Sequence, residues 1–361
     1  MLDSINIKSF KSFINATIPL NKLTILTGLN NSGKSSIIQA IRMCLLCKDN
    51  LSPYISGHGD FSDLKSKLSS LHSKIDISLM EESGCNSNRM LNIKLEEDTT
   101  SCDCSIAPIS YDYISADRHG PSVILPTMNN GISNITIGSK GEYFVDYYLK
   151  FENVIIPELM RHEDSIGNTL KHQVSYWMSE ISPGVDLNFE VNKNHDISHL
   201  EVNTFRATNT GFGISYSLPI VLSALTMSSL PPLDEFKHSK IKKWHNCPNK
   251  LLIVENPEAH LHPRGQTSLG KLVALASACG VQVIVETHSD HFVDGVRLAV
   301  KQYKEIYAQD CTIHYLTREK GMESVSEEIK ISEDGRLSSW PVGFFDQTSI
   351  NLSKLAKRER K

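Results

Sequence analysis

A short glycine-rich segment near the amino end carries the residues of clearest chemical character. Residues 28–36 read GLNNSGKSS, which fits the spacing G-x-x-x-x-G-K-S/T of a phosphate-binding loop. Gly28 and Gly33 permit backbone angles at which successive N–H groups turn toward an anion. Lys34 supplies a positive charge for the β- and γ-phosphates, and the Ser35 hydroxyl is placed to ligate Mg²⁺. We therefore predict that this loop binds a nucleoside triphosphate together with Mg²⁺.

An acidic residue follows a buried strand in the second half of the chain. Residues 251–254 are four consecutive aliphatic residues, and Glu255 comes directly after them. A carboxylate at the tip of a central strand, beside a phosphate loop, is where the Mg²⁺ of a nucleotide needs an anchor. The alternative is an acid on the protein surface, which the aliphatic run and the following Pro257 argue against. We therefore assign the Mg²⁺ anchor to Glu255.

The same pattern recurs further along the chain. Residues 283–290 read VIVETHSD, a buried strand followed by polar residues at its carboxyl end. A histidine after a strand is usually structural when it stands alone. Beside a phosphate loop and a strand-end acid, however, His288 is placed to contact the γ-phosphate or the attacking water. We predict this functional role for it.

A second glycine-rich segment opens a helix. Residues 209–219 read NTGFGISYSLP and lead into an apolar helical run, with Ser215 as the expected N-cap. A glycine loop at a helix start can bind a second anion, here through Gly211, Gly213 and Ser215. The alternative is an ordinary helix amino end, and the residues alone leave both interpretations open.

The elements around the phosphate loop follow from hydrophobic periodicity. A strand over 23–27 precedes the loop and a helix over 34–48 follows it, so a chance glycine turn is not favoured. Alternating apolar and polar residues predict half-exposed antiparallel strands over 5–7, 10–20, 73–80 and 90–96. The loop is therefore expected beside an antiparallel β-layer.

The second half of the chain has a different pattern. Strands over 251–254 and 281–285 flank a helix over 264–279, and their continuous apolar runs are typical of a parallel sheet covered on both faces. Helical stretches over 142–180 and a β-like segment over 185–205 lie between the two halves. Later elements are expected as a helix over 290–306, strands near 312–316 and 326–331, and a charged, frayed end over 354–361.

Bulk composition restricts the class of protein. The 361 residues are 22% charged and 40% hydrophobic, as in ordinary globular proteins. No apolar run approaches the ~20 residues that cross a bilayer, and no signal-peptide core opens the chain, so we expect a cytoplasmic protein without a membrane partner. The net charge of −4 argues against a uniformly basic nucleic-acid binder. The eight cysteines form no convincing zinc pattern and are expected to be reduced thiols.

Taken in order, the four polar segments resemble those of the ABC-type ATPase heads of the RecF, SMC and OLD group. The likeness is greatest to the branch with E-E/N-P-E-A-H-L-H-P followed by T-H-S, found here at 255–263 and 287–289. Similar segments also occur at 5–13, 115–121, 138–142 and 339–346, so the likeness covers nearly the whole chain. The implied fold is an α/β P-loop head that combines a mixed sheet with a parallel core, an antiparallel β-layer and an inserted helical lobe.

This resemblance implies a division of the chain and a role for each segment. The amino-terminal half of the head is expected over 1–140, the insertion over 141–205 and the carboxy-terminal half over 206–361. Walker A supplies the expected ATP contacts: Gly28, Asn30, Asn31, Ser32, Gly33, Lys34, Ser35 and Ser36. Ser35 and Glu255 would ligate Mg²⁺, residues 259–262 would form the D-loop, and His288 would be the switch histidine. The segment with Gly211, Gly213 and Ser215 would be the signature motif, which contacts the γ-phosphate held by the other subunit.

Three features depart from the pattern of this group. Asn256 stands where most such heads have a glutamate, and an amide cannot act as the general base, so Glu258 is the available carboxylate. Arg118 lies near the expected Q-loop, where no glutamine matches. Many OLD relatives continue into a Toprim-type nuclease domain, but only ~70 residues follow the T-H-S strand here. We therefore expect any nuclease to be a separate polypeptide.

Three functions remain open at this level. The first is an ATPase that closes head-to-tail as a homodimer around ATP·Mg²⁺, senses or engages DNA, and controls a separately encoded effector, a nuclease, in defence against phage. The second is an ATP-locked scaffold with negligible hydrolysis, for which Asn256 is the reason. The third is a DNA-repair ATPase similar to RecF. Candidate DNA contacts are Lys8, Lys11, Lys237, Lys240, Lys242 and Lys243, although a short basic run is more often a solvated loop.

Overall fold

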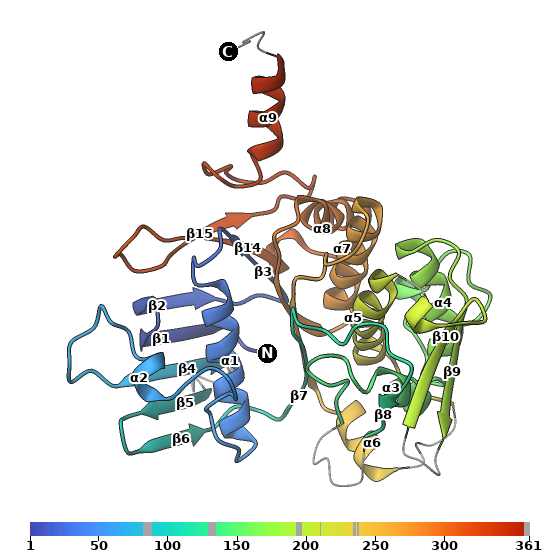
Figure 1. Cartoon of the computed structure of the whole chain (residues 1–361), viewed down its shortest axis with the longest axis horizontal. Coiled ribbons are helices and arrows are strands. Elements are labelled where there is room, and N and C mark those ends of the chain that lie inside the picture. The colour runs from blue at the N-terminus through green and yellow to red at the C-terminus, as the bar shows by residue number, and fades with distance from the viewer. Residues whose placement is uncertain are drawn as a thin grey trace.

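The structure, a computed structural model, describes residues 1–81, 89–128, 135–192, 197–209, 211–233, 236 and 238–356. A six-stranded sheet in the order β15-β14-β3-β13-β12-β7 forms its centre (Figure 1). The strands are β3 (Leu23–Gly28), β7 (Ile109–Ile114), β12 (Asn249–Glu255), β13 (Val281–Glu286), β14 (Cys311–Thr317) and β15 (Val325–Lys330). All pair in parallel except β15, which pairs antiparallel with β14 at one edge. The parallel core predicted from the apolar runs is therefore present.

The strand order decides which residues meet at the carboxyl edge of this sheet. β13 lies between β3 and β12, and Glu286 at its end is in register with Leu26 on one side and Glu255 on the other. The carboxyl ends of these three strands therefore present the phosphate loop, Glu286 and Glu255 side by side. Polar chemistry concentrates at such an edge in open α/β sheets.

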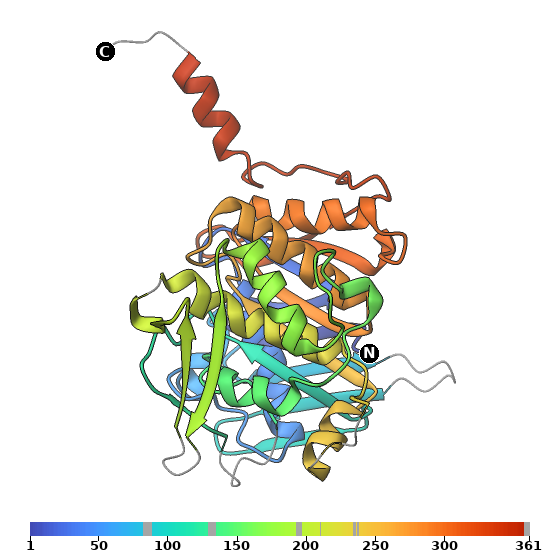
Figure 2. The ribbon, with the colours of Figure 1, turned by 90° about the vertical axis from the view of Figure 1, so that its right-hand side faces the viewer.

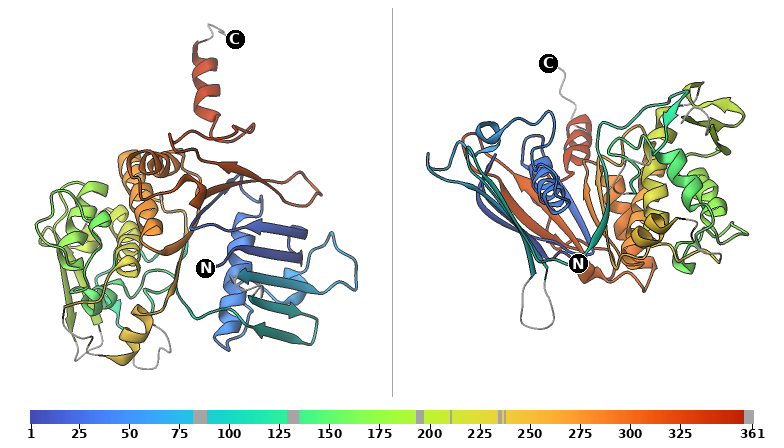
Figure 3. Two further views of the ribbon diagram at one scale, coloured as in Figure 1. Left: turned by 180° about the vertical axis from the view of Figure 1, so that it is seen from behind. Right: turned by 90° about the horizontal axis from the view of Figure 1, so that it is seen from below.

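A second sheet covers one face of the phosphate-loop helix. It is antiparallel, in the order β2-β1-β4-β5-β6. Its strands are β1 (Ser4–Phe10), β2 (Phe13–Pro19), β4 (Ile75–Glu81), β5 (Arg89–Leu95) and β6 (Thr100–Cys104). Helix α1 (Lys34–Lys48) is packed between this sheet and the central one, where its apolar residues share one buried core with both (Figure 3). The antiparallel layer predicted from alternation is confirmed.

Helices cover the opposite face of the central sheet and enclose a second core. They are α5 (Phe212–Ser228), α7 (Pro263–Ala278) and α8 (Asp290–Gln302). α7 and α8 can approach closely because Gly270 has no side chain. A Cβ at this position would lie 2.2 Å from the carbonyl oxygen of Phe292. On the facing helix, a Cβ on Gly295 would lie 2.1 Å from the carbonyl oxygen of Thr267. These two glycines fix how the helix after the D-loop packs on the switch helix.

A smaller lobe flanks these helices on the side away from the antiparallel sheet (Figure 1). Its elements are β8 (Leu125–Pro126), α3 (Phe144–Phe151), η1 (Glu158–Met160), α4 (Leu170–Ile181), β9 (Leu187–Asn192), β10 (Ile197–Val202), β11 (Phe205–Arg206) and η2 (Ala207–Asn209). Aromatic contacts join the lobe internally: the rings of Tyr148 and Phe189 stack at 3.9 Å. The lobe shares the core of α5 and α7, so it is packed on the head rather than projecting as an arm.

Several local expectations need correction. A short helix, α2 (Phe61–Leu64), follows the loop after α1. The basic run before β12 forms α6 (Ser239–His245) and not a loop. Residues up to 356 form α9 (Gln347–Ala356), which stands away from the body with no buried residue (Figure 2), so residues 354–356 are helical, and the rest of the expected frayed end lies outside the described residues. Residues 82–88, between β4 and β5, lie outside the described residues. No helix in the described part of the chain is long and apolar enough to span a membrane.

Candidate functional site

The phosphate loop joins β3 to α1 in the conformation that its glycines allow. Gly28 has φ 139° and Gly33, the N-cap of α1, has φ 107°, both in the region that disfavours side chains. A Cβ on Gly28 would lie 2.2 Å from the carbonyl oxygen of Leu316, on the neighbouring strand. Asn31 also adopts a left-handed conformation, with φ 64°. The loop therefore curves back on itself between a strand and a helix, as predicted.

The lysine of the loop is held inside it. Lys34 is 3% exposed, and its ammonium donates to the carbonyl oxygens of Gly28, at 3.0 Å, and Leu29, at 2.9 Å. Burial lowers the pKa of Lys34, while the nearby carboxylates of Glu286 and Glu258 oppose that shift. The buried Ser32 hydroxyl has no hydrogen-bond partner among the described residues. The loop thus offers a buried cation and an unsatisfied hydroxyl, which fit a phosphate group.

Glu286 is a site residue that the sequence analysis missed. It is buried at the tip of β13, where the Ser35 hydroxyl donates to its two carboxylate oxygens at 3.1 and 3.0 Å. The Lys34 ammonium lies 3.9 Å from the same carboxylate. Burial raises the pKa of Glu286 to about 7, and the negative charge of Glu255 adds to the rise. The available signal was that both buried strands, β12 and β13, end in a glutamate.

Glu255 occupies the predicted place at the end of β12. Its carboxylate accepts a hydrogen bond from the Tyr113 hydroxyl at 3.1 Å and a longer one from the Ala116 N–H at 3.4 Å. The guanidinium of Arg42, on α1, lies 3.7 Å from the centre of the Tyr113 ring. Burial raises the pKa of Glu255, and the bond from Tyr113 opposes the rise. The side chain is therefore oriented by β7 and α1 before any ligand is considered.

The segment after β12 is tied to the switch strand through Glu258. Its carboxylate accepts from the Thr287 hydroxyl at 2.7 Å and from the backbone N–H of His288 at 2.8 Å. Asn256, which replaces the glutamate of most such heads, has φ 45°, a conformation that asparagine adopts more readily than most residues. The imidazole of His288 lies at the surface, at the same end of the sheet. Glu258 thus joins the segment after β12 to the segment after β13.

The glycine-rich segment before α5 differs from the prediction in one respect. Gly211 is the N-cap of α5, so the expectation that Ser215 caps the helix is wrong. Ser215 lies one turn inside the helix and is 3% exposed, whereas Gly211 is exposed. Gly211 begins the helix without a side-chain hydrogen bond, and its φ of −68° and ψ of 153° are the ordinary angles of an N-cap residue. Of the three signature residues, Gly211 is therefore the accessible one.

The same segment packs against the D-loop. A Cβ on Gly213 would lie 2.8 Å from the carbonyl oxygen of His260. The Phe212 and His260 rings lie 5.2 Å apart, and Tyr216 meets His260 edge-on at 4.6 Å. Phe212 is nevertheless 51% exposed. The signature and D-loop segments thus form one surface with an exposed aromatic ring.

Arg118 has a defined structural role. It is 3% exposed, and its guanidinium donates to the carbonyl oxygens of Ser115 at 3.0 Å and Tyr216 at 2.9 Å. It also donates to the carbonyl oxygen of Glu255 at 2.7 Å and to that of Asn256. Burial lowers the pKa of Arg118 to about 10. One side chain therefore connects the end of β7, the first turns of α5 and the end of β12.

A pocket of about 420 Å³ lies over the phosphate loop. Its walls include Gly33, Lys34 and Ser35 of the loop. Four further cations line it: Lys11, Lys65, Lys67 and Arg318. Positive side chains around a glycine-rich loop suit a polyphosphate. For Mg²⁺, the oxygen atoms of Ser35, Glu286 and Glu255 are the hard ligands it prefers, with water completing its shell. The residues present therefore fit ATP with Mg²⁺.

The candidate DNA contacts are dispersed. Lys8 is exposed on β1, whereas Lys11 is partly buried and donates to the side chain of Gln39. Lys237 lies outside the described residues. Three of the remaining candidates are exposed on α6: Lys240, Lys242 and Lys243. Trp244, the aromatic residue of this run, is 7% exposed and packs against Phe151, so it is unavailable for stacking on bases.

Three protein-family profiles match parts of the chain. Residues 150–293 match the profile of the AAA ATPase domain family, and residues 4–105 match that of an AAA domain family. Residues 306–355 match a family described as a protein of unknown function, DUF3696. No curated protein sequence matches the chain. The two ATPase-family matches thus cover separate stretches, one containing the phosphate loop and the other containing β12 and β13.

A solved structure shares the fold. An SMC head bound to the C-winged helix domain of ScpA aligns with a TM-score of 0.51 at 15% identity, covering 90% of this chain and 97% of that one. The chain folds as an SMC-type ATPase head. The SMC head domain of Thermotoga maritima covers 90% of this chain and 98% of its own, at 14% identity with a TM-score of 0.48. RecF of the RecFOR pathway covers 91% of this ATPase head and 98% of its own chain, at 11% identity with a TM-score of 0.48.

Proposed function

We propose that this ATPase head binds ATP·Mg²⁺ at the phosphate loop and hydrolyses it between two copies that close head-to-tail. The observation that carries the proposal is the convergence at one sheet edge of a buried lysine, a hydroxyl and two carboxylates. Lys34 and Ser35 come from the loop, and Glu286 and Glu255 end the two neighbouring strands. The cation suits the phosphates of a nucleotide, and the hydroxyl and the carboxylates suit its metal ion.

Each residue then has a separable task. The loop N–H groups and Lys34 would hold the β- and γ-phosphates, with Lys34 leaving the carbonyl oxygens that it now contacts. Ser35 and Glu255 would hold Mg²⁺, which when bound supplies charge neutralisation at the phosphate oxygens. Glu258 is the proposed proton acceptor for the attacking water, with His288 beside it. Glu286 orients Ser35 and is the further carboxylate nearest the loop.

We propose that the second copy is contacted by the surface around Gly211. This glycine is exposed at the start of α5, and the N–H groups of a first helical turn attract an anion. Apart from the neighbours of Gly211 along the chain, no residue that the structure describes lies within 4 Å of a Cβ built on it, so the position is open to a second copy. Phe212, exposed beside it, adds apolar area to the same surface. We assign to Gly211, Gly213 and the helix start the contact with the partner's γ-phosphate.

A scaffold that binds ATP without turnover is the second candidate. Asn256 has no proton-accepting group, and the Glu258 carboxylate is already engaged by Thr287 and by the His288 N–H. Unless this carboxylate is freed in the closed dimer, hydrolysis lacks a base. The two candidates share ATP-dependent closure and differ only in turnover.

ATP-dependent closure of the dimer would provide a switch between two states. We propose that opening and closing of the dimer engages DNA and controls a separately encoded effector, a nuclease, in defence against phage. The family resemblance supports this role, and a function in DNA repair is the alternative. Co-purification of the chain with the product of a neighbouring gene, and an ATP-dependent change in that complex, would support control of an effector.

The deciding experiment measures ATP turnover by the purified chain with Mg²⁺, alone and with double-stranded DNA. Lys34→Ala serves as the matched negative control, because it removes the phosphate contact without changing the exposed surface. Turnover that is lost in this variant supports the enzyme. Tight ATP binding without turnover favours the scaffold, and absence of both contradicts the proposal.

A further inference from the structure

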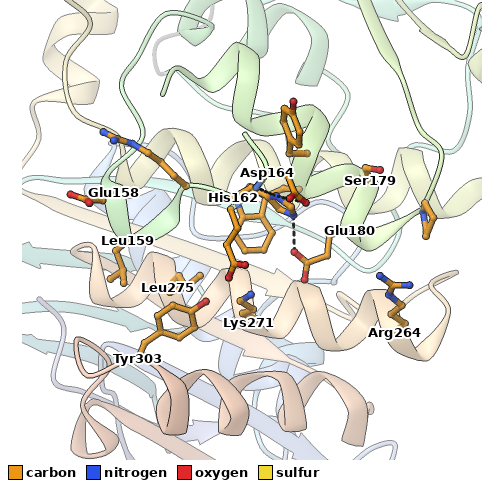
Figure 4. Close-up of a pocket in the computed structure, with 15 residues that line it drawn as sticks. Glu158, Leu159, His162, Asp164, Ser179, Glu180, Arg264, Lys271, Leu275 and Tyr303 are labelled. Atoms are coloured by element: carbon orange, nitrogen blue, oxygen red, sulfur yellow. Dashed lines mark hydrogen bonds and ion pairs between the residues drawn. The ribbon is translucent and has the colours of Figure 1, made fainter. Parts of the chain in front are cut away.

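A second pocket lies away from the phosphate loop. It has a volume of about 790 Å³ and separates the lobe from α7 (Figure 4). Pockets of roughly 300–1,000 Å³ are typical of small-molecule sites. One wall is built from residues 158–164 and α4 of the lobe, and the other from α7 and Tyr303 of the head. Nothing in the proposed ATP chemistry uses it.

Hydrogen bonds inside the lobe hold its wall of the pocket together. Trp177 donates its indole N–H to the carbonyl oxygen of Met160 at 2.9 Å. The backbone N–H of His162 donates to the buried Gln173 side chain at 2.7 Å, and the His162 ring lies 3.1 Å from the Glu180 carboxylate. Figure 4 shows His162 and Glu180 facing each other across this wall. A preformed wall costs a ligand little ordering.

The head wall presents two cations that lack an acidic partner. Arg264 and Lys271 lie two turns apart on one face of α7, and neither forms an ion pair with any residue that the structure describes. The Lys271 ammonium lies 5.7 Å from the ring centres of both Trp177 and Tyr303. Such a cation between two aromatic rings is held in place without being neutralised. This wall is therefore suited to an anionic group.

The opposite wall carries one cation, Arg161, whose guanidinium donates to the carbonyl oxygen of Ile156 at 3.0 Å, and is otherwise acidic. Four carboxylates line it: Glu158, Glu163, Asp164 and Glu180. Carboxylates accept hydrogen bonds from N–H groups, such as those on the edge of a nucleobase. Tyr176 and Tyr303 contribute rings to the pocket, on which a planar group can stack. A ligand that spans the pocket therefore needs an anionic end and a planar end that donates hydrogen bonds.

We propose that this pocket binds a nucleoside monophosphate, with its phosphate on Arg264 and Lys271 and its base against the aromatic and acidic wall of the lobe. The chemistry of the two walls selects this ligand class over a simple anion. An inorganic phosphate would satisfy only the head wall, and a neutral aromatic compound only the lobe wall.

The pocket is also mechanically connected to the proposed ATPase site. A Cβ on Gly265 would lie 2.3 Å from the carbonyl oxygen of Ile181, so the end of α4 touches the first turn of α7 directly. His262, the N-cap of α7, ends the D-loop, which begins just after Glu258. A ligand that bridges α4 and α7 would therefore act on the D-loop. This second part rests on the proposed function, whereas the binding itself does not.

The test is calorimetric titration of the full chain with AMP, GMP, CMP and UMP, and with inorganic phosphate as the simple anion. Lys34→Ala is used as the background, so that the phosphate loop does not contribute. We expect binding of at least one monophosphate, weakened about tenfold or more by Lys271→Gln and by Arg264→Gln. Lys301→Gln removes an equal charge from an exposed position on α8 and should leave the affinity unchanged.

Three results would overturn the binding proposal: no heat with any monophosphate at ~1 mM, equal affinity for inorganic phosphate, or unchanged affinity in Lys271→Gln. For the coupling, ATP turnover of the chain with intact Lys34 should change when the bound monophosphate is added, and should not change in Lys271→Gln. Binding without any change in a measurable turnover would overturn the coupling. Binding by a chain that turns over no ATP would count against the ATPase and leave the pocket supported.

Discussion

The Ser35 hydroxyl donates to both carboxylate oxygens of Glu286, at 3.1 and 3.0 Å, although 251 positions separate them in the chain. The Lys34 ammonium lies 3.9 Å from the same carboxylate. The two side chains to which we assign the nucleotide contacts are thus held by an acid from the adjacent strand. Binding of ATP·Mg²⁺ has to exchange these contacts, which makes Glu286 both a competitor for the loop and a candidate to orient the metal.

Substitution of Glu286 by glutamine separates these two effects. The negative charge beside the phosphates is lost, so we expect the affinity for ATP measured in EDTA to stay the same or to increase. Turnover with Mg²⁺ should fall by about tenfold to a hundredfold, as when an outer ligand of a metal is removed. Glu305→Gln, at an exposed acid, serves as the control and should change neither quantity. Full turnover in Glu286→Gln would remove this residue from the site.

Glu258 decides between the enzyme and the scaffold. In Glu258→Gln the amide oxygen can accept only part of the pair of bonds from Thr287 and His288. If Glu258 is the base, steady-state turnover should fall by about a hundredfold or more, while ATP-dependent dimerisation persists. The comparison uses turnover and sedimentation velocity on one preparation. An unchanged rate would mean that another group takes the proton.

We expect a substitution of Arg118 to lower both the stability of the fold and the rate of ATP turnover. A lysine at this position would place one ammonium where a planar group now donates to four carbonyl oxygens on three segments. We therefore expect Arg118→Lys to lower the free energy of unfolding by about 2 kcal/mol, since buried carbonyl groups lose their donors. ATP affinity should change little and turnover should fall, because the start of α5 is no longer fixed to the end of β12. Arg336→Lys, at an exposed arginine, is the matched control. A stable variant with normal turnover would contradict the role.

The stability of the fold should depend on pH through His245. This residue is 3% exposed and its imidazole contacts the Ser229 hydroxyl at 2.9 Å; burial lowers its pKa from 6.5 to about 4. The unfolded chain therefore binds a proton below about pH 6.5 that the folded chain does not bind until about pH 4, and stability falls as the pH drops. Between pH 7 and pH 5 this one group should cost about 2 kcal/mol.

The measurement is denaturant unfolding at the two pH values, for the wild type and for His245→Gln. The variant should lose less stability on acidification than the wild type, by the amount assigned to His245. Equal losses in both proteins would show that the imidazole is protonated in the folded state without penalty.

Features that depend on a few neighbouring residues could be predicted from the sequence, and features that depend on strand order could not. Local spacing predicted the phosphate loop, the helix after it and the strands that end in Glu255 and Glu286, because the hydrophobic period and the glycine positions act over a few residues. The role of Glu286 was missed because it depends on β13 lying between β3 and β12, which only strand order shows. Ser215 was misplaced because a helix can begin without a side-chain cap.

Contacts between distant segments were equally beyond the sequence. Arg118 meets the carbonyl oxygens of Tyr216 and Glu255 because three elements converge at one sheet edge, and its neighbours along the chain give no sign of this. The pocket beside α7 combines residues 158–183 with Arg264, Lys271 and Tyr303 in the same way. Such sites depend on how helices and strands pack against one another, and the hydrophobic pattern of a short segment does not show this packing.

The central claim is that two copies share each nucleotide, one through Lys34 and the other through Gly211. Gly211→Glu is a suitable partner for Lys34→Ala, because no described residue beyond its chain neighbours lies within 4 Å of the added Cβ, and the backbone angles of Gly211 are ordinary. Each variant alone should be inactive in ATP turnover. In an equal mixture, half of the dimers carry one intact composite site of two, so we predict recovery of about a quarter of the wild-type rate. No recovery on mixing, or full activity of Gly211→Glu alone, would contradict the account.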